Sequence, residues 1–357
     1  GRYYITKNKD QSELLKPLRE FHNYIKTSII VGTSSSFLQK KISVLDLSCG
    51  RGGDIPKFLN KDSNIEFLLG LDISTNVTEA CQRFYNDNKN TQTKAVFIRG
   101  DTGKNIKNGD CILIEDEKDN HYNYKEHSES MINILYDKQK PILKKYNQVY
   151  KRYRGLAKDG FEIINSQFSM HYYFETENTF RGFIKNIDEN IKQGGYFIGT
   201  CYDGQRIFDL PERIFELKDE SDNLLFQIKK EYSLTDFTYD PENIKSMFGN
   251  KIDVYMESIG KTFSEYIVNF DFFLGEMKKI GMELVNPKMK LQYQTIFKSK
   301  YMDERGIGSL ENVIQDIQDI QKDKYFKNFY SRASMIQDNS SVAKLSSLNN
   351  YFIFRKK

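Results

Sequence analysis

The chain has 357 residues, of which 39% are hydrophobic and 14% aromatic, so it can bury a sizeable core and is not a disordered chain. Its net charge of only +4 excludes binding to polyanions through bulk charge, although a local basic patch can still hold a few phosphates. Four scattered cysteines without metal-ligand spacing indicate no disulfide framework, no zinc site and a reducing intracellular compartment. No apolar run approaches the ~18 residues of a membrane span, so we expect no membrane partner.

The first third of the chain predicts strands that alternate with helices. In chain order we expect a helix at residues 14–32, a strand at 42–47, a glycine-rich turn at 48–54, a strand at 66–72, a helix at 76–87 and a strand at 95–98. This alternation indicates an α/β fold with a doubly wound, mostly parallel sheet.

The rest of the chain departs from that rhythm and then partly resumes it. We interpret residues 111–160 as a polar insertion, partly helical near 131–153, and residues 331–350 as a mobile Ser/Asn-rich loop. The other predicted elements are strands at 161–166, 196–200, 214–217, 225–228, 252–255, 282–285 and 351–354, and helices at 177–193 and 270–281.

We interpret the whole chain, 1–357, as one domain with four parts. These are a cofactor-binding half at 14–110, the insertion at 111–160, a resumed core sheet at 161–200, and strand-rich additions with a C-terminal strand at 201–357.

The segment Val44-Leu-Asp-Leu-Ser-Cys-Gly-Arg-Gly-Gly-Asp54 places small residues where a strand turns into a helix, so a cofactor can lie against the backbone. Asp72 ends the next strand, where a carboxylate can accept hydrogen bonds from both ribose hydroxyls. The acid before the glycines, Asp46, favours a sulfonium cofactor without a pyrophosphate, and Asp101 is the expected contact to the adenine amine. The alternative, a tight turn without a ligand, is disfavoured because the turn and the downstream acid occur together.

Four segments carry a resemblance to a known family: Phe21-His-Asn-Tyr-Ile-Lys26, Leu45-Asp-Leu-Ser-Cys-Gly-Arg-Gly-Gly-Asp54, Gln167-Phe-Ser-Met-His-Tyr-Tyr-Phe-Glu175 and Ser264-Glu-Tyr-Ile-Val268. The chain resembles the mRNA cap (guanine-N7) methyltransferases, especially the methyltransferase domain of capping enzymes from large DNA viruses. The likeness runs from about Leu14 to Leu291 and includes the last strand. Its most specific part is Gln-Phe-Ser-x-His-Tyr.

The resemblance implies a Rossmann-like class I methyltransferase with a strand-rich cap-binding addition. It implies S-adenosylmethionine as cofactor, S-adenosylhomocysteine as product and capped mRNA as substrate. Other capping-enzyme domains or a stimulatory subunit are the implied partners. The compartment would be the host cytoplasm or the virion for a viral protein, and the nucleus for a cellular one.

The resemblance also assigns residues to the cofactor. Lys26 would meet the carboxylate of the methionine moiety, and Gln167 and Tyr172 would lie near that moiety. The remaining cofactor residues line the turn or hold the adenosine: Asp46, Ser48, Gly50, Asp72 and Asp101.

On the substrate side, the resemblance implies that His171 donates to guanine O6. Glu265 would accept from guanine N1–H and the exocyclic amine, and Asn23 would belong to the cap-contacting segment. The implied phosphate contacts are Arg51, Lys57 and Arg83.

The sequence departs from the family pattern at three positions. Ser48 stands where the family usually has Gly, and His22 stands where a cap-contacting Asn is common. Asn349 stands at the position of the family's base-stacking Tyr, so Tyr351, two residues along the same strand face, is the expected substitute.

Guanine N7 has a free lone pair and no proton to lose, so the implied reaction needs alignment and charge stabilisation and no general base or metal. Positioning would come from His171, Tyr172 and Glu265. We find no Lys-centred cluster for a 2′-hydroxyl acceptor and no Asn/Asp-Pro-Pro-aromatic motif for adenine N6. Two alternatives stay open: a class I methyltransferase on another nucleic-acid or protein acceptor, and a non-catalytic cofactor-binding subunit of a capping complex.

Overall fold

The computed structural model describes residues 15–37, 40–89, 91–113, 123–257, 259–285, 296, 298–320, 332–338 and 340–357. The strands are β1 (Ile42–Asp46), β2 (Ile65–Asp72), β3 (Lys94–Arg99), β4 (Phe161–Gln167), β5 (Ile191–Tyr202), β6 (Ile214–Lys218), β7 (Leu224–Lys230), β8 (Lys251–Met256), β9 (Lys261–Tyr266), β10 (Met282–Leu284), β11 (Gly308–Ser309) and β12 (Asn349–Lys356).

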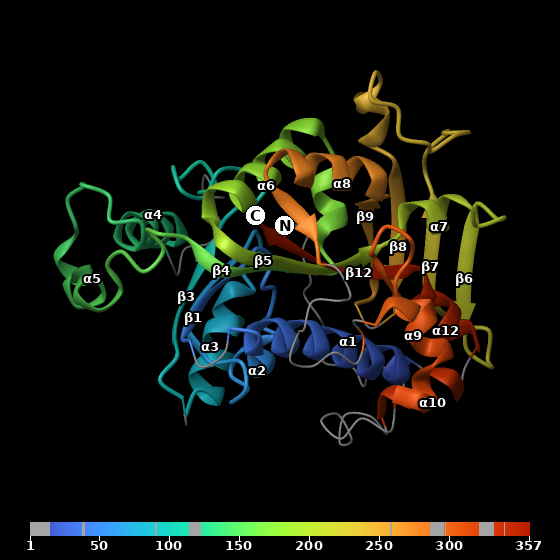
Figure 1. The fold of residues 1–357 in the computed structure, drawn as a ribbon, viewed down its shortest axis with the longest axis horizontal. Helices are drawn as coiled ribbons and strands as arrows, with labels where there is room; N and C mark the ends of the chain where they lie inside the picture. Colours follow the sequence, from blue (N-terminus) through green and yellow to red (C-terminus); the bar gives the residue numbers. More distant parts are fainter. Residues whose placement is uncertain are drawn as a thin grey trace.

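The helices cover the strands on several sides (Figure 1). The α-helices are α1 (Lys16–Ser35), α2 (Ile55–Phe58), α3 (Val77–Asp87), α4 (Tyr124–Leu135), α5 (Asn147–Tyr153), α6 (Glu177–Asn190), α7 (Gly204–Phe208), α8 (Phe270–Lys279), α9 (Leu310–Gln315), α10 (Ile317–Ile320) and α12 (Ser340–Ser347). The 3-10 helices are η2 (Lys144–Tyr146), η3 (Met170–Phe174), η4 (Ile244–Met247), η5 (Ser299–Tyr301) and η6 (Ser334–Asp338). No helix in the described part of the chain is both long and apolar enough to cross a bilayer.

The strands form two sheets. The larger has the order β10-β12-β5-β4-β1-β2-β3, with β11 paired to β12, and the smaller has the order β6-β7-β8-β9. Strands β3, β2, β1, β4 and β5 are parallel neighbours, whereas β12 is antiparallel to β5. The prediction of a doubly wound, mostly parallel sheet is therefore confirmed.

Helices pack on both faces of the larger sheet, which explains why every residue of β1 is buried. Successive side chains of β1 point to opposite faces. Val44 belongs to the core cluster that contains Ile25 of α1, and Leu45 belongs to the cluster that contains Phe183 of α6. Figure 1 shows α1, α2 and α3 on one side of this sheet and α6 and α8 on the other.

The insertion lies between β3 and β4, at the β3 edge of the larger sheet (Figure 1). The prediction that the insertion is partly helical near 131–153 is confirmed, because the segment forms α4 and α5 with a break between them. The break follows from Asp137, whose φ is +52°, and from Pro141, which cannot donate a helical hydrogen bond. Helix α4 is fixed to the sheet by Ser128, whose Oγ donates to the Arg99 carbonyl at 2.9 Å.

The prediction of a mobile loop at 331–350 is wrong, because the described residues of this stretch form η6, α12 and the start of β12. Val342 and Leu345, three residues apart on α12, are buried in the core. The helix also contacts α1, since His22 Nε2 lies 3.0 Å from Ser346 Oγ. Composition was misleading here because two buried apolar side chains are enough to anchor a short helix that is otherwise rich in serine.

Candidate functional site

The predicted cofactor residues lie at the carboxyl ends of the parallel strands, where ligands of doubly wound sheets bind. In the turn after β1, Gly50 has φ +50° and its N–H donates to Asp72 Oδ2 at 2.8 Å. The other carboxylate oxygen, Asp72 Oδ1, accepts from Ser74 N at 2.9 Å and Ser74 Oγ at 2.6 Å. The acid thus shapes the turn, and a carboxylate still has lone pairs left for a ligand.

The glycines of this turn have different roles. A Cβ on Gly52 would come within 2.5 Å of Ile55 Cδ1 and 3.0 Å of Ala80 Cα, so this position must be Gly for the turn to pack on α3. A Cβ on Gly53 would meet nothing within 4 Å, and one on Gly50 would meet only Asp72 Oδ2, at 4.0 Å. The side of the turn that faces Asp72 is therefore open, which fits a nucleoside held close to the backbone.

A chain of hydrogen bonds joins the ends of β1, β4 and β5. Thr200 Oγ1 donates to Gln167 Oε1 at 2.9 Å, Gln167 Nε2 donates to Asn165 Oδ1 at 2.8 Å, and Asn165 Nδ2 donates to Asp46 Oδ1 at 3.2 Å. Burial, with a smaller contribution from Asp54, raises the pKa of Asp46 to about 7. The structure connects Asp46 and Gln167, both predicted cofactor residues, through Asn165. The sequence singled out neither Asn165 nor Thr200.

Lys26 and Lys57 both bind the carboxylate of Asp54, with Nζ–Oδ1 distances of 2.7 Å and 2.9 Å. Burial would raise the pKa of Asp54, but the two ammonium groups outweigh it and hold that pKa well below its usual range. Lys57 also donates to Asn23 Oδ1 at 3.2 Å, and the lysine is only 8% exposed. Lys57 is thus part of a buried cluster, and its predicted role at the cap phosphates stays a prediction.

The Gln-Phe-Ser segment has a strained backbone. Phe168 has φ +49°, which is unfavourable for a residue with a bulky side chain and is typical of functional sites. Its N–H donates to the Thr200 carbonyl at 2.9 Å, and its ring stacks on His22 with centroids 4.5 Å apart. These contacts fix the strand end from which η3 begins.

Three serines join the cofactor turn to this segment. Ser48 Oγ is hydrogen-bonded to Ser169 Oγ, which also lies 2.9 Å from Ser166 Oγ. Ser48, which stands where the family usually has Gly, therefore contributes a hydroxyl contact between the turn and the start of η3. Ser48 and Ser169 each lie in a segment that carries the family resemblance, but the sequence alone did not show that the two side chains contact one another.

His171 and Glu265 come from different elements and face one another. His171 lies on η3, Glu265 lies on β9, and the distance from Nε2 to Oε1 is 3.5 Å. Both residues are buried, at 3% and 5% exposed. Burial lowers the pKa of His171 to about 3 and raises the pKa of Glu265 to about 8, so both are largely neutral at pH 7.

Several polar atoms of this pair are buried without a hydrogen-bond partner in the part of the chain that the structure describes. Within the described residues, neither ring nitrogen of His171 nor Oε2 of Glu265 has a hydrogen-bond partner. Such groups are costly unless something else binds them. The His171 ring lies 4.3 Å from the ring of Tyr172 and 6.1 Å from that of Tyr202, between centroids, so aromatic rings flank the pair.

Asp101 lies beyond the end of β3. Its Oδ1 accepts from Gly103 N at 2.9 Å, and its Oδ2 lies 3.6 Å from Lys104 Nζ. These are the contacts of a loop aspartate, and the predicted contact to adenine stays a prediction.

Arg51 and Arg83 share one carboxylate. Arg51 Nε lies 2.5 Å from Glu79 Oε2, and Arg83 Nη2 lies 3.0 Å from Glu79 Oε1. All three side chains are about one third exposed or more, and such pairs contribute only ~0–1 kcal/mol. An incoming phosphate can therefore displace Glu79 at small cost.

Tyr351, the expected substitute for a base-stacking tyrosine, is used for packing in this structure. The residue is 1% exposed, and its hydroxyl donates to the Ile296 carbonyl. A Cβ on Gly308 would come within 2.1 Å of the Tyr351 ring, so the ring fills the space that this glycine leaves. Asn349, the other candidate, is buried and donates toward the carbonyls of α12.

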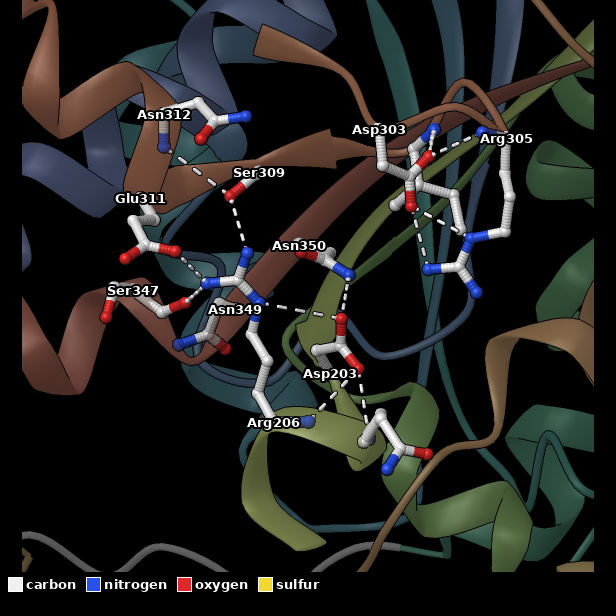
Figure 2. Close-up of polar contacts among 12 residues, drawn as sticks. Asp203, Arg206, Asp303, Arg305, Ser309, Glu311, Asn312, Ser347, Asn349 and Asn350 are labelled. Carbon is white, nitrogen blue, oxygen red and sulfur yellow. Dashed lines mark hydrogen bonds and ion pairs between the residues drawn. The ribbon is translucent and has the colours of Figure 1, made fainter. Parts of the chain in front are cut away.

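A polar network fixes β12 beside the end of β5, as Figure 2 shows. Asn350 Nδ2 donates to Asp203 Oδ2 at 2.8 Å, and Asp203 Oδ1 caps α7. Arg206 donates to Glu311 Oε2 at 2.6 Å and to the Ser347 carbonyl at 2.8 Å. These residues lie far apart in the sequence and were not predicted.

The chain matches a family model described as the mRNA (guanine-N(7))-methyltransferase domain, over residues 2–328. It is 28% identical over 360 residues to the "Probable mRNA-capping enzyme" of Acanthamoeba polyphaga mimivirus, which covers 95% of this chain and 27% of that protein. It is 26% identical to the "mRNA cap guanine-N(7) methyltransferase" of Candida glabrata (78% of this chain, 55% of that protein) and to that of Aspergillus niger (82% and 44%). The chain thus spans from about a quarter to about half of the length of these curated relatives.

Proposed function

Because the chain belongs to the mRNA (guanine-N7)-methyltransferase domain family, we propose that it transfers the methyl group of S-adenosylmethionine to N7 of the guanine cap of messenger RNA. The observation that carries this proposal is the buried pair of His171 and Glu265, which has polar atoms without hydrogen-bond partners among the described residues. His171 follows by two residues Ser169, which contacts Ser48 of the cofactor turn.

The pair matches the edge of guanine. An N–H of His171 donates to O6, and the carboxylate of Glu265 accepts from N1–H and from the exocyclic amine. Adenine offers neither the acceptor nor this pair of donors. Since Glu265 is mostly protonated in the free protein, guanine binding is coupled to loss of its proton.

The cofactor fits the open side of the glycine-rich turn. Asp72 holds the ribose hydroxyls there, Asp101 receives the adenine amine, and Gln167 and Tyr172 lie along the methionine portion. Lys26 meets the carboxylate of that portion while it keeps its contact with Asp54. The bound cofactor supplies an electrophilic methyl carbon on a positively charged sulfur.

The residues of the site act by positioning. N7 attacks with a lone pair that carries no proton, so no side chain has to serve as a base. The hydrogen-bond chain from Thr200 to Asp46 fixes the strand ends beneath the cofactor, and η3 fixes His171 and Tyr172. The reaction moves positive charge from sulfur to the guanine ring, and the ionised Glu265 stabilises that charge on the base.

Arg51 and Arg83 are the available contacts for the cap phosphates, because their shared partner Glu79 is exposed and exchangeable. Lys57 stabilises the site through its contacts with Asp54 and Asn23. As part of the same proposal, the chain works beside other capping-enzyme domains or a stimulatory subunit in a reducing intracellular compartment.

The test uses the purified protein, methyl-labelled S-adenosylmethionine and three acceptors: GpppG, ApppA and an uncapped transfer RNA. We expect label at N7 of GpppG alone, and S-adenosylhomocysteine in equal amount. Label on transfer RNA or on protein in place of GpppG would favour a methyltransferase with another acceptor. Cofactor binding without transfer to any acceptor would favour a non-catalytic subunit.

A further inference from the structure

One segment within the insertion concentrates positive charge. Residues 138–158, here called the basic segment, contain no aspartate or glutamate. They contain eight cationic side chains: Lys138, Lys140, Lys144, Lys145, Lys151, Arg152, Arg154 and Lys158. Since the whole chain has a net charge of +4, the rest of it is net negative.

Most of these cations are not neutralised. Lys145 pairs with Glu126, and Arg154 Nε lies 2.6 Å from Asp137 Oδ1. The other six form no ion pair with any residue that the structure describes, and seven of the eight are exposed, Lys138 being half-buried. Like charges concentrated in this way destabilise a surface unless it meets an anion.

Tyrosines alternate with these cations. Tyr146, Tyr150 and Tyr153 are each partly exposed. Lys145 lies 5.4 Å from the first ring centroid, Arg154 lies 5.2 Å from the second, and Arg152 lies 5.5 Å from the third. Cations that contact phosphates, together with aromatic and guanidinium planes on which bases stack, are the features of single-stranded RNA binding.

The basic segment is also well placed for RNA. Arg51 and Arg83, proposed above for the cap phosphates, flank Glu79 of α3, and α3 is joined to α4 by the 2.9 Å hydrogen bond between Thr78 Oγ1 and Tyr124 Oη. Beyond α4, η2 and α5 form the outer edge of the molecule on this side (Figure 1). A transcript that leaves the cap phosphates across α3 reaches the insertion next.

We propose that the basic segment binds the single-stranded RNA that follows the cap, through phosphate contacts and base stacking, and so favours capped transcripts over free cap dinucleotides. The path of the RNA, from the cap phosphates to the basic segment, rests on the proposed function. Affinity of the surface for RNA does not depend on methyl transfer.

The test compares two triple variants with the wild type. The first reverses three exposed, unpaired lysines of the basic segment (Lys140→Glu, Lys144→Glu, Lys151→Glu). The control reverses three lysines elsewhere that are equally exposed and form no ion pair within the described residues (Lys61→Glu, Lys89→Glu, Lys278→Glu). The probes are a fluorescent uncapped 12-nucleotide RNA, the same RNA with a GpppG cap, and free GpppG.

We expect the first variant to bind uncapped RNA at least tenfold more weakly at about 100 mM salt, with a logarithmic salt dependence shallower by about 2, as for three lost phosphate contacts. Its kcat/KM for the capped RNA should fall accordingly, whereas that for GpppG stays at the wild-type value. The control should match the wild type in all three measurements.

Equal RNA affinity of the two variants would overturn the proposal. The proposal would also be overturned if polyglutamate displaced the fluorescent RNA as strongly as unlabelled RNA of equal charge does. The surface would then suit an acidic protein as well as it suits RNA. If the first variant melts at a lower temperature, Lys→Gln replacements at the same positions repeat the comparison without added negative charge. If no protein methylates GpppG, the proposed function fails while the affinity for uncapped RNA still decides the proposal.

Discussion

At the scale of single residues, Glu265 links recognition to protonation. Burial raises its pKa to about 8, so the free protein holds it mostly neutral, but guanine needs it ionised. We predict that GpppG binding releases up to one proton near pH 7 and that the affinity rises with pH up to about 8. Calorimetry in buffers of different ionisation enthalpy measures the protons directly. In Glu265→Gln the release should vanish; an unchanged release would place the proton elsewhere.

The same shift makes folding depend on pH in a defined direction. A carboxyl whose pKa is raised by folding stabilises the protein fully below the unfolded value, about 4.5, and this stabilisation is lost as the pH rises through about 8. We predict that the free energy of unfolding of the wild type, relative to Glu265→Gln, decreases from pH 5 to pH 8.5. Urea unfolding at four pH values provides the measurement, and a relative stability that stays flat would contradict the burial of Glu265.

Asp72 tests the cofactor site. Asp72→Asn preserves the size of the side chain and one acceptor oxygen but loses the charge that receives the ribose hydroxyls. We expect S-adenosylhomocysteine to bind ~1.5–3 kcal/mol more weakly, the range for hydrogen bonds to a charged group. The matched control is Asp87→Asn at the exposed end of α3, for which we expect no change. Wild-type affinity in Asp72→Asn by calorimetry would rule out the ribose assignment.

At the scale of elements, the packing of β11 on β12 depends on the absence of a side chain at Gly308. In Gly308→Ala the new Cβ would overlap the enclosed ring of Tyr351. We predict a loss of ~1–3 kcal/mol in the free energy of unfolding, as for other overpacked cores. Gly275→Ala, inside α8 with no atom within 4 Å of the new Cβ, should instead add ~0.5–1 kcal/mol. Thermal melts that showed the same change in both variants would contradict this packing.

Local patterns in the sequence predicted some elements and missed others. The strands of the parallel core were visible because they are short apolar runs bounded by turns. Gly50 and Asp72 were assigned to one cofactor site because a glycine-rich turn and a downstream acid occur together in the sequence. Helix α12 was missed because its anchoring depends on Val342 and Leu345 finding a core that distant residues build. The partners of Ser48, Asp54 and Tyr351 could not be predicted, since each contact depends on the placement of a separate element.

At the scale of the whole molecule, the two proposed ligands differ in the sheets that they touch. Most cofactor residues belong to the larger sheet and its loops, with Lys26 on α1 and Tyr172 on η3. The guanine residues His171 and Glu265 come from η3 and from β9 of the smaller sheet. We predict that S-adenosylhomocysteine slows hydrogen exchange in the turn at 47–54 and leaves β8 and β9 unchanged. GpppG should slow exchange in β8 and β9 as well, measured by mass spectrometry. Protection of β9 by the cofactor alone would contradict this separation.

The position of β12 has a consequence for synthesis on the ribosome. This strand covers the open edge of β5, yet it follows β5 by roughly 150 residues, which take about 8–30 s to add at ~5–20 residues per second. During that time the growing polypeptide exposes the unpaired backbone of an apolar strand, with which other chains can pair. The smaller sheet is made within this interval, so the nascent chain can form its guanine-reading strands before the sheet that supports them is complete. A chaperone or nascent helix that covers the edge of β5 during this interval has to dissociate before β12 can pair with β5.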